Sequence, residues 1–205
     1  MHTLKQLQHP DMQTIPFSKE IAPSEIPRGS FPNSGPPAYA TGDGFTYNLT
    51  SLRVPGMEII SPELRLPLSS SASDFAASVD VMLGQTTLDR GQATALIAGL
   101  NRGLSFVQGP PGTGKTYLGV ALVKAILASR PENDKRPIVV TCMTNHALDS
   151  FLKDLHNQGV HNLVRLGAGS KEKWTESISL VGMRKGQTSH SGFGRWKSAI
   201  RRVEG

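Results

Sequence analysis

The 205-residue sequence lacks the features of several protein classes. It has one cysteine, Cys142, which excludes an internal disulfide, and its scattered histidines provide no zinc-ligand spacing. No run of about 18 apolar residues could span a membrane, and the N-terminal residues lack the apolar stretch of a signal peptide. We therefore expect a protein of the nucleus or cytoplasm, in a reducing compartment, that is not secreted and has no membrane partner.

Charge is distributed unevenly along the chain. Residues 1–80 hold five Lys/Arg and eight Asp/Glu, whereas residues 81–205 hold seventeen Lys/Arg and eight Asp/Glu. A basic excess suits a polyanionic partner such as nucleic acid. An ordinary basic surface would give the same balance, so charge alone leaves both interpretations open.

The first third of the chain is rich in proline. Ten of the fourteen prolines fall within residues 1–70, and hydrophobic residues make up only 38% of the chain. Because proline removes a backbone donor and interrupts helices, we expect residues 1–44 to form an extended or disordered arm. Aromatic and polar residues alternate from Phe45 onward, which predicts a small β-rich segment over residues 45–83, with strands near 45–52 and 56–60.

The centre of the chain carries a phosphate-binding pattern. Residues 109–116 read GPPGTGKT and match G-x-x-x-x-G-K-[ST] without a mismatch. The apolar run 104–108 before them predicts a buried strand, and residues 117–129 after them predict a helix. We expect Tyr117 and Phe151 to lie in the core, with stacking on a base as the alternative. A glycine- and proline-rich turn could match the pattern by chance, but the strand–loop–helix context favours a nucleotide site.

The chemistry of this loop suits a triphosphate. Successive backbone N–H groups form a concave nest for anions, and the start of the next helix adds further donors. We predict that Lys115 contacts the β- and γ-phosphates, that the Thr116 hydroxyl binds Mg²⁺, and that both act in catalysis. The other loop residues that we expect to bind the nucleotide are Gly109, Pro110, Pro111, Gly112, Thr113 and Gly114.

Helices and strands alternate around the loop. We predict helices over residues 87–101, capped by Thr87, and over 146–155, capped by Asn145, with strands at 138–142 and 163–166. Apolar strands that alternate with helices imply an α/β fold, in which helices cover both faces of a parallel sheet.

Gln92 lies 23 residues before Lys115, on the helix that leads to the loop. Its side-chain amide offers a donor and an acceptor side by side, which complement N7 and N6 of adenine. We therefore predict that Gln92 binds the base of ATP and discriminates against GTP by about 1–3 kcal/mol. A surface glutamine without a ligand is the alternative.

Together these stretches resemble the motifs of a known family. Residues 88–92 (LDRGQ) resemble the Q motif of superfamily 1 helicases, residues 109–116 their motif I, and residues 139–149 (VVTCMTNHALD) their motif Ia. Residues 163–167 (LVRLG) are similar to the segment that follows. The wording of motif Ia is most similar to the NFX-type zinc-finger helicases, relatives of the Up-frameshift helicases that include fungal helicases of RNA-interference heterochromatin assembly.

The resemblance implies a RecA-like P-loop NTPase core, of which residues 84–170 would be the first part. It implies ATP and Mg²⁺ as cofactors, single-stranded RNA or DNA as partner, and membership of an RNA-silencing or RNA-decay complex. It also implies that Thr144 and Asn145 bind phosphates or sugars of the strand, although Asn145 could serve only as a helix cap. His146 could touch nucleic acid or only pack at the turn.

One part of the helicase pattern is missing from these residues. Helicases of this class hold Mg²⁺ with an Asp-Glu pair on a later strand, and no Asp-Glu dipeptide occurs here. Hydrolysis also needs arginines from a second RecA-like domain. We therefore expect the ATP-binding fragment of an ATP-dependent helicase, truncated before that motif and ending in a basic, flexible tail over 171–205. The alternative is a non-catalytic, nucleotide-responsive interaction module or inactive remnant. A small-molecule kinase is disfavoured, because the sequence shows no sign of a substrate lid.

Overall fold

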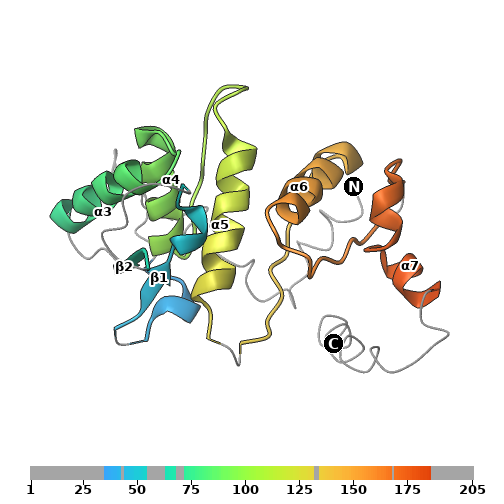
Figure 1. Cartoon of the computed structure of the whole chain (residues 1–205), viewed down its shortest axis with the longest axis horizontal. Coiled ribbons are helices and arrows are strands. Elements are labelled where there is room, and N and C mark those ends of the chain that lie inside the picture. Colours follow the sequence, from blue (N-terminus) through green and yellow to red (C-terminus); the bar gives the residue numbers. More distant parts are fainter. Residues whose placement is uncertain are drawn as a thin grey trace, which may run out of the picture. The chain divides into compact units, whose positions relative to one another are not determined.

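The computed structural model describes residues 35–42, 44–54, 63–67, 72–131, 134–167 and 169–185. The chain forms two compact units, Met1–Arg136 and Pro137–Gly205, shown in Figure 1. The boundary falls inside residues 84–170, which we expected to form the first part of one RecA-like domain. Within the described parts of the chain, we find no helix with the length and apolar character needed to cross a membrane.

The first unit begins with short elements. They are η1 (Ala38–Ala40), β1 (Thr46–Asn48), η2 (Thr50–Leu52) and β2 (Arg65–Pro67). The strands pair antiparallel, with Tyr47 opposite Leu66, and both side chains are buried. The predicted arm 1–44 is wrong for its last described residues, because Ala40 is fully buried in the core. Residues 1–34 and the predicted strand 56–60 lie outside the described residues.

Helix α3 (Ala72–Gln85) was not anticipated from the sequence. It occupies most of the second half of the segment 45–83, where we expected β-structure, so that expectation is wrong for residues 72–83. The helix buries Val79 and Met82 in the core, and Phe75 and Leu83 pack against it. These four positions are spaced 0, 4, 7 and 8, which is the helical period, and the serine-rich start conceals it.

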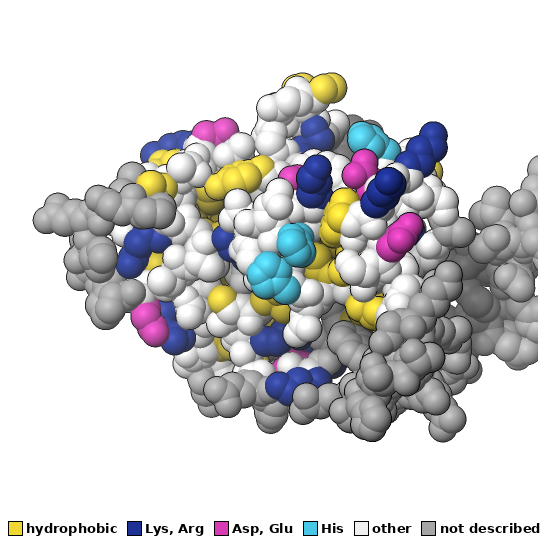
Figure 2. Space-filling model, turned by 45° about the vertical axis from the view of Figure 1, so that its right-hand side comes forward, with side chains coloured by type: hydrophobic (Ala, Val, Ile, Leu, Met, Phe, Trp, Pro, Cys, Tyr) yellow, Lys and Arg dark blue, Asp and Glu magenta, His cyan; other side chains and the backbone are white. Residues whose placement is uncertain are grey.

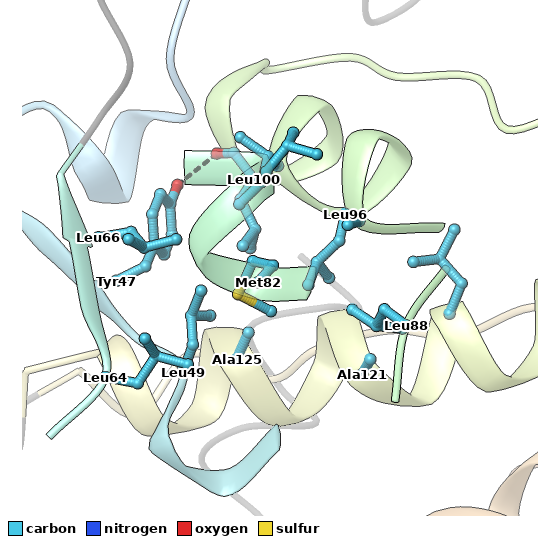
Figure 3. Close-up of a cluster of buried hydrophobic side chains, with 14 of the residues drawn as sticks. Tyr47, Leu49, Leu64, Leu66, Met82, Leu88, Leu96, Leu100, Ala121 and Ala125 are labelled. Atoms are coloured by element: carbon cyan, nitrogen blue, oxygen red, sulfur yellow. Dashed lines mark hydrogen bonds between the residues drawn. The ribbon is translucent and has the colours of Figure 1, made fainter. Parts of the chain in front are cut away.

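Helices α4 (Arg90–Asn101) and α5 (Lys115–Ser129) complete the first unit. Helix α4 buries Leu96, Ile97 and Leu100, and α5 buries Leu118 and Ala121, so both face a shared core (Figure 3). The buried Tyr47 hydroxyl donates a hydrogen bond to the Leu100 carbonyl, which fixes β1 against the end of α4. The core therefore packs α4 against α5, which begins at the end of the phosphate loop.

The second unit contains α6 (Asn145–Asn157), η3 (Lys173–Glu176) and α7 (Leu180–Lys185). The predicted helix 146–155 is confirmed, and it ends before Gly159, which adopts a positive φ of 85°. The predicted flexible tail is wrong for residues 171–185, because they form η3 and α7 and bury Thr175 and Ile178. The rest of that tail, residues 186–205, lies outside the described residues.

The predicted parallel sheet is not formed among the residues that the structure describes. Residues 104–108 and 138–142 belong to no strand, and residues 163–166 make one isolated parallel bridge, between Arg165 and Ser179. Phe106 and Val139 remain 74% and 78% exposed. A strand needs a neighbouring strand to pair its N–H and C=O groups, so an apolar run without that neighbour forms no ladder.

Candidate functional site

The phosphate loop ends directly in α5. Gly112 and Gly114 have φ values of 82° and 76°, a left-handed conformation that suits glycine. Gly114 is the N-cap of α5, and no side chain caps the helix there. The first N–H groups of a helix have no intrahelical acceptor, so this turn aims backbone donors and the positive end of the helix dipole at one place.

Two glycines of the loop leave room that a side chain would fill. A Cβ at Gly109 would lie 2.7 Å from Thr113 Oγ1, and a Cβ at Gly114 would lie 2.4 Å from Gln92 Nε2. Both distances are below van der Waals contact. A side chain at either position would have to displace the neighbouring side-chain atom, and at Gly114 the positive φ adds backbone strain.

Lys115 folds across its own loop. Its ammonium donates to the carbonyl oxygens of Gly109 and Pro110 at 2.8 and 2.6 Å, and Thr113 Oγ1 donates to the same Pro110 oxygen at 2.9 Å. An ammonium has three donors, so a third remains for a phosphate oxygen while the two loop contacts persist. Lys115 and Thr116 are both exposed. Their side chains are accessible to a phosphate and its metal ion.

Gln92 connects the start of α4 with the phosphate loop. Its Nε2 donates to the Thr113 carbonyl at 3.2 Å, and its Oε1 accepts from the Asp89 N–H at 3.1 Å. Asp89 Oδ1 in turn accepts from the Gln92 N–H at 2.8 Å, which completes a capping box. The prediction that Thr87 caps this helix is therefore wrong. The Asp-x-x-Gln spacing carried this signal, and sequence reasoning missed it.

The capping box leaves part of the Gln92 amide for a ligand. A glutamine amide has two N–H donors and two acceptor lone pairs, and the contacts above use one of each. One donor and one acceptor remain, which is the set that adenine requires. These hydrogen bonds leave room for the adenine contact, which stays a prediction.

Tyr117 makes a second bridge on the same side of the unit. Its hydroxyl lies 2.9 Å from Thr87 Oγ1, and its side chain is 46% exposed. The prediction that Tyr117 lies in the core is wrong, because its position on α5 faces the segment before α4. Two side-chain bridges therefore join the Gln92 segment to the phosphate loop and its helix.

The predicted nucleic-acid residues lie in the second unit, at the start of α6. Thr144 is the N-cap, and its Oγ1 accepts from the Ala147 N–H at 3.2 Å. The prediction that Asn145 caps the helix is wrong, because Asn145 is its first residue. Thr144, Asn145 and His146 are all exposed.

Behind this turn lies a buried ion pair that sequence reasoning missed. Arg165 Nε donates to Asp149 Oδ1 at 2.6 Å, and the two side chains are only 2% and 4% exposed. Arg165 also donates to Asn145 Oδ1 at 2.9 Å and to the Gly167 carbonyl at 2.8 Å. The sequence signal was an arginine inside the apolar run 163–166 and an aspartate on the apolar stripe of α6.

The pKa of Asp149 reflects this network. Burial raises the pKa of the carboxyl group, but hydrogen bonds from Arg165 and from the Ser170 hydroxyl, with the charge of Arg165 and a smaller effect of His146, lower it below its ordinary value. Ser170 Oγ donates to Asp149 Oδ2 at 2.7 Å. Asp149 is therefore ionised and fully paired at neutral pH.

Neither the basic side chains on the face shown in Figure 2 nor the metal-binding side chains of the described residues gather into a cluster. On the face shown in Figure 2, the basic side chains of the described residues are scattered and interspersed with acidic ones, so they form no single patch. Nor do the described residues hold three or more His, Cys, Asp or Glu side chains grouped for a metal ion. The role of Thr116 as a Mg²⁺ ligand at the loop stays a prediction.

The comparisons with known proteins agree with the loop geometry. The sequence model of the AAA domain family matches residues 87–197, which include the phosphate loop and α6. The chain belongs to this family. Its relatives identify it more closely as a member of the superfamily 1, Up-frameshift-like helicases, and the family has the P-loop NTPase α/β fold.

Three relatives illustrate the similarity. The chain is 32% identical over 199 residues to human "NFX1-type zinc finger-containing protein 1", covering 89% of this chain. It is 35% identical over 108 residues to "Helicase required for RNAi-mediated heterochromatin assembly 1" of Schizosaccharomyces pombe, covering 53% of this chain. It is 35% identical over 98 residues to "ATP-dependent helicase upf1" of the same organism, covering 47% of this chain.

The similarity covers a small part of each relative. The chain spans 10% of the length of each of these three proteins. No solved structure matches the chain. The activities of the whole relatives come to this Up-frameshift-like chain only as proposals.

Proposed function

We propose that this chain is the ATP-binding part of an ATP-dependent RNA or DNA helicase. The observation that carries the proposal is the loop 109–116, in which a left-handed Gly114 starts α5 and Lys115 lies across the loop carbonyls. Backbone donors, a lysine and a hydroxyl in this order fit a triphosphate with its Mg²⁺. The relatives, which include ATP-dependent helicases, support ATP as the nucleotide.

Each residue of the loop has a defined task in this proposal. The N–H groups at 112–116 bind phosphate oxygens, Lys115 adds a positive charge at the β- and γ-phosphates, and Thr116 offers its hydroxyl to Mg²⁺. When bound, Mg²⁺ neutralises phosphate charge and orients the terminal phosphate. The free donor and acceptor of Gln92 hold the adenine base.

The second unit contributes the nucleic-acid contact. Thr144, Asn145 and His146 are exposed at the start of α6, where a strand of RNA or DNA can reach them. Polar side chains at a helix start suit phosphate and sugar oxygens. RNA silencing, which the name of one relative mentions, and RNA decay, which the resemblance to Up-frameshift helicases implies, are the settings to test, in the nucleus or the cytoplasm.

The direct test is calorimetric titration of Mg-ATP into the full chain and into Lys115→Ala. Lys115 is exposed, so its loss should leave the fold intact and abolish measurable ATP binding. Lys153→Ala removes an exposed lysine of α6 in the other unit and should bind ATP as the unaltered chain does. Equal affinity in Lys115→Ala and the unaltered chain would reject the proposal.

A second candidate is a nucleotide-responsive interaction module that does not hydrolyse ATP. The sequence favours it in one respect, because these 205 residues contain no Asp-Glu dipeptide to hold the metal ion and water. A phosphate-release assay separates the candidates. Turnover by the chain that disappears in Lys115→Ala would exclude the module, whereas ATP binding without turnover would support it.

A further inference from the structure

The buried Arg165 guanidinium makes a hydrogen bond through each of its three nitrogens. Its Nε atom binds Asp149, and its two terminal nitrogens bind the Gly167 carbonyl and Asn145 Oδ1, at distances of 2.6 to 2.9 Å. A planar guanidinium fixed through three nitrogens can present its donors in only one direction. Its side chain is 2% exposed, so a nucleic acid cannot reach it directly.

The contact with Arg165 determines which way the Asn145 amide faces. A guanidinium has donors and no acceptor, so only the amide oxygen of Asn145 can bind it. The amide nitrogen is therefore turned away from the guanidinium and keeps its donors. Gly169, which has a φ of 87°, lies beside this nitrogen, and a Cβ there would come within 2.9 Å of Asn145 Nδ2, so glycine avoids a clash with the donor.

We propose that Arg165 is a positioning residue that turns Asn145 into a hydrogen-bond donor to the phosphate oxygens of a single nucleic-acid strand. The amide oxygen of Asn145 is occupied by Arg165, and Asn145 itself is exposed. The backbone of a nucleic acid presents acceptors at every phosphate, and a fixed N–H donor suits them without reading the base. This inference rests on the proposed function, which places the strand at the start of α6.

The ion pair with Asp149 holds Arg165 in the place from which it binds Asn145. Asp149 is one turn along α6 from Asn145 and accepts from both Arg165 and Ser170. The same guanidinium thus ties the start of α6 to residues 165–170. A buried ion pair is poor support for stability in itself but can fix the register of the segments that it joins.

The test measures binding of fluorescein-labelled oligouridine to the full chain by fluorescence anisotropy. In Asn145→Asp, one carboxylate oxygen still accepts from Arg165, while the donor is lost and a negative charge faces the phosphates. Affinity should fall roughly ten- to a hundredfold, the effect of losing a hydrogen bond to a charged group. The control Asn157→Asp adds the same charge at the far end of α6 and should change affinity by less than about twofold.

A second pair of variants tests the role of Arg165. Arg165→Lys keeps the charge beside Asp149 but loses the planar fork, so it should weaken binding in the unaltered chain. It should have no further effect in Asn145→Ala, because the residue through which it acts is gone. A merely structural arginine would weaken binding equally in both backgrounds, and that result would overturn the inference.

Further measurements show whether Asn145 contacts a phosphate or a ribose hydroxyl, and whether a negative result rejects this inference or the proposed function. Because Asn145 is neutral, its loss should leave the slope of affinity against salt unchanged. Oligothymidine should respond to Asn145→Asp as oligouridine does if the acceptor is a phosphate, whereas an effect on oligouridine alone would assign it to the ribose hydroxyl and contradict the proposal. If the unaltered chain binds neither oligonucleotide, the nucleic-acid part of the proposed function fails as well. If it binds both and Asn145→Asp binds equally, only the present inference fails.

Discussion

Asp149→Asn should destabilise the second unit severely. The substitution keeps the shape of the side chain but leaves the Arg165 guanidinium, 2% exposed, without its counter-charge. Removing one partner of a buried ion pair costs about 3–5 kcal/mol, because the other charge remains buried and unpaired. Small domains are stable by only about 5–15 kcal/mol, so this loss is a large fraction of the total.

Tryptophan fluorescence isolates this effect. Both tryptophans, Trp174 and Trp196, belong to the unit Pro137–Gly205, and the other unit has none. In a urea titration with a slope of about 2 kcal/mol per molar, the fluorescence midpoint of Asp149→Asn should fall by about 2 M. Asp154→Asn changes an exposed aspartate of the same helix and should shift stability by less than about 0.5 kcal/mol. Equal midpoints for Asp149→Asn and the unaltered chain would refute the ion-pair reasoning.

The stabilisation that Asp149 provides should depend on pH. The folded-state pKa of Asp149 is lowered, so the group binds fewer protons folded than unfolded, where its pKa is about 3.9. Its stabilisation is therefore present above about pH 4 and is lost as pH falls through the folded pKa. The difference in urea midpoint between the unaltered chain and Asp149→Asn should narrow in acid, and a constant difference would contradict this assignment.

Three further substitutions test the first unit. Gly114→Ala puts an alanine where φ is 76° and its Cβ 2.4 Å from Gln92 Nε2, so it should lower Mg-ATP affinity at least tenfold in calorimetry. Gly84→Ala, whose Cβ would have nothing within 4 Å, should leave the affinity unchanged. Tyr47→Phe removes the hydroxyl that donates to the buried Leu100 carbonyl, so it should lower the free energy of unfolding by about 1–3 kcal/mol, measured by thermal unfolding with circular dichroism. Tyr117→Phe loses only an exposed contact and should lower it by less than about 1 kcal/mol. Gln92→Ala should reduce the preference for ATP over GTP by about 1–3 kcal/mol in competition binding, and an unchanged preference would remove its role at the base.

The sequence predicted the helices well where the apolar period was long and clean. Helices α4, α5 and α6 lie within a few residues of their predicted positions, because each combines a buried stripe with an end signal. Helix α3 was missed, since its serine-rich start and acidic residues concealed four apolar positions at helical spacing. The caps at Asp89 and Thr144 were each misplaced by one or two residues, a common uncertainty at helix ends.

Long-range pairing could not be derived from the sequence in the same way. An apolar run such as 104–108 predicts a strand, but its pairing depends on neighbours that a local pattern does not specify. The buried pair of Arg165 and Asp149 joins residues 16 apart and shows no local periodicity. The phosphate-loop motif was predicted because its residues are contiguous, whereas the capping box of Gln92 and its bond to Thr113 became visible only in three dimensions.

The central claim is that the backbone N–H groups of the phosphate loop bind the triphosphate of ATP. Amide chemical shifts of ¹⁵N-labelled full chain test it most directly, in a titration with Mg-ATP and a parallel titration with adenosine. We predict that the amides of Gly112, Gly114, Lys115 and Thr116 shift strongly with Mg-ATP and little with adenosine, which has no phosphates. Loop amides that remain unchanged at saturating Mg-ATP, or that respond equally to adenosine, would contradict the account.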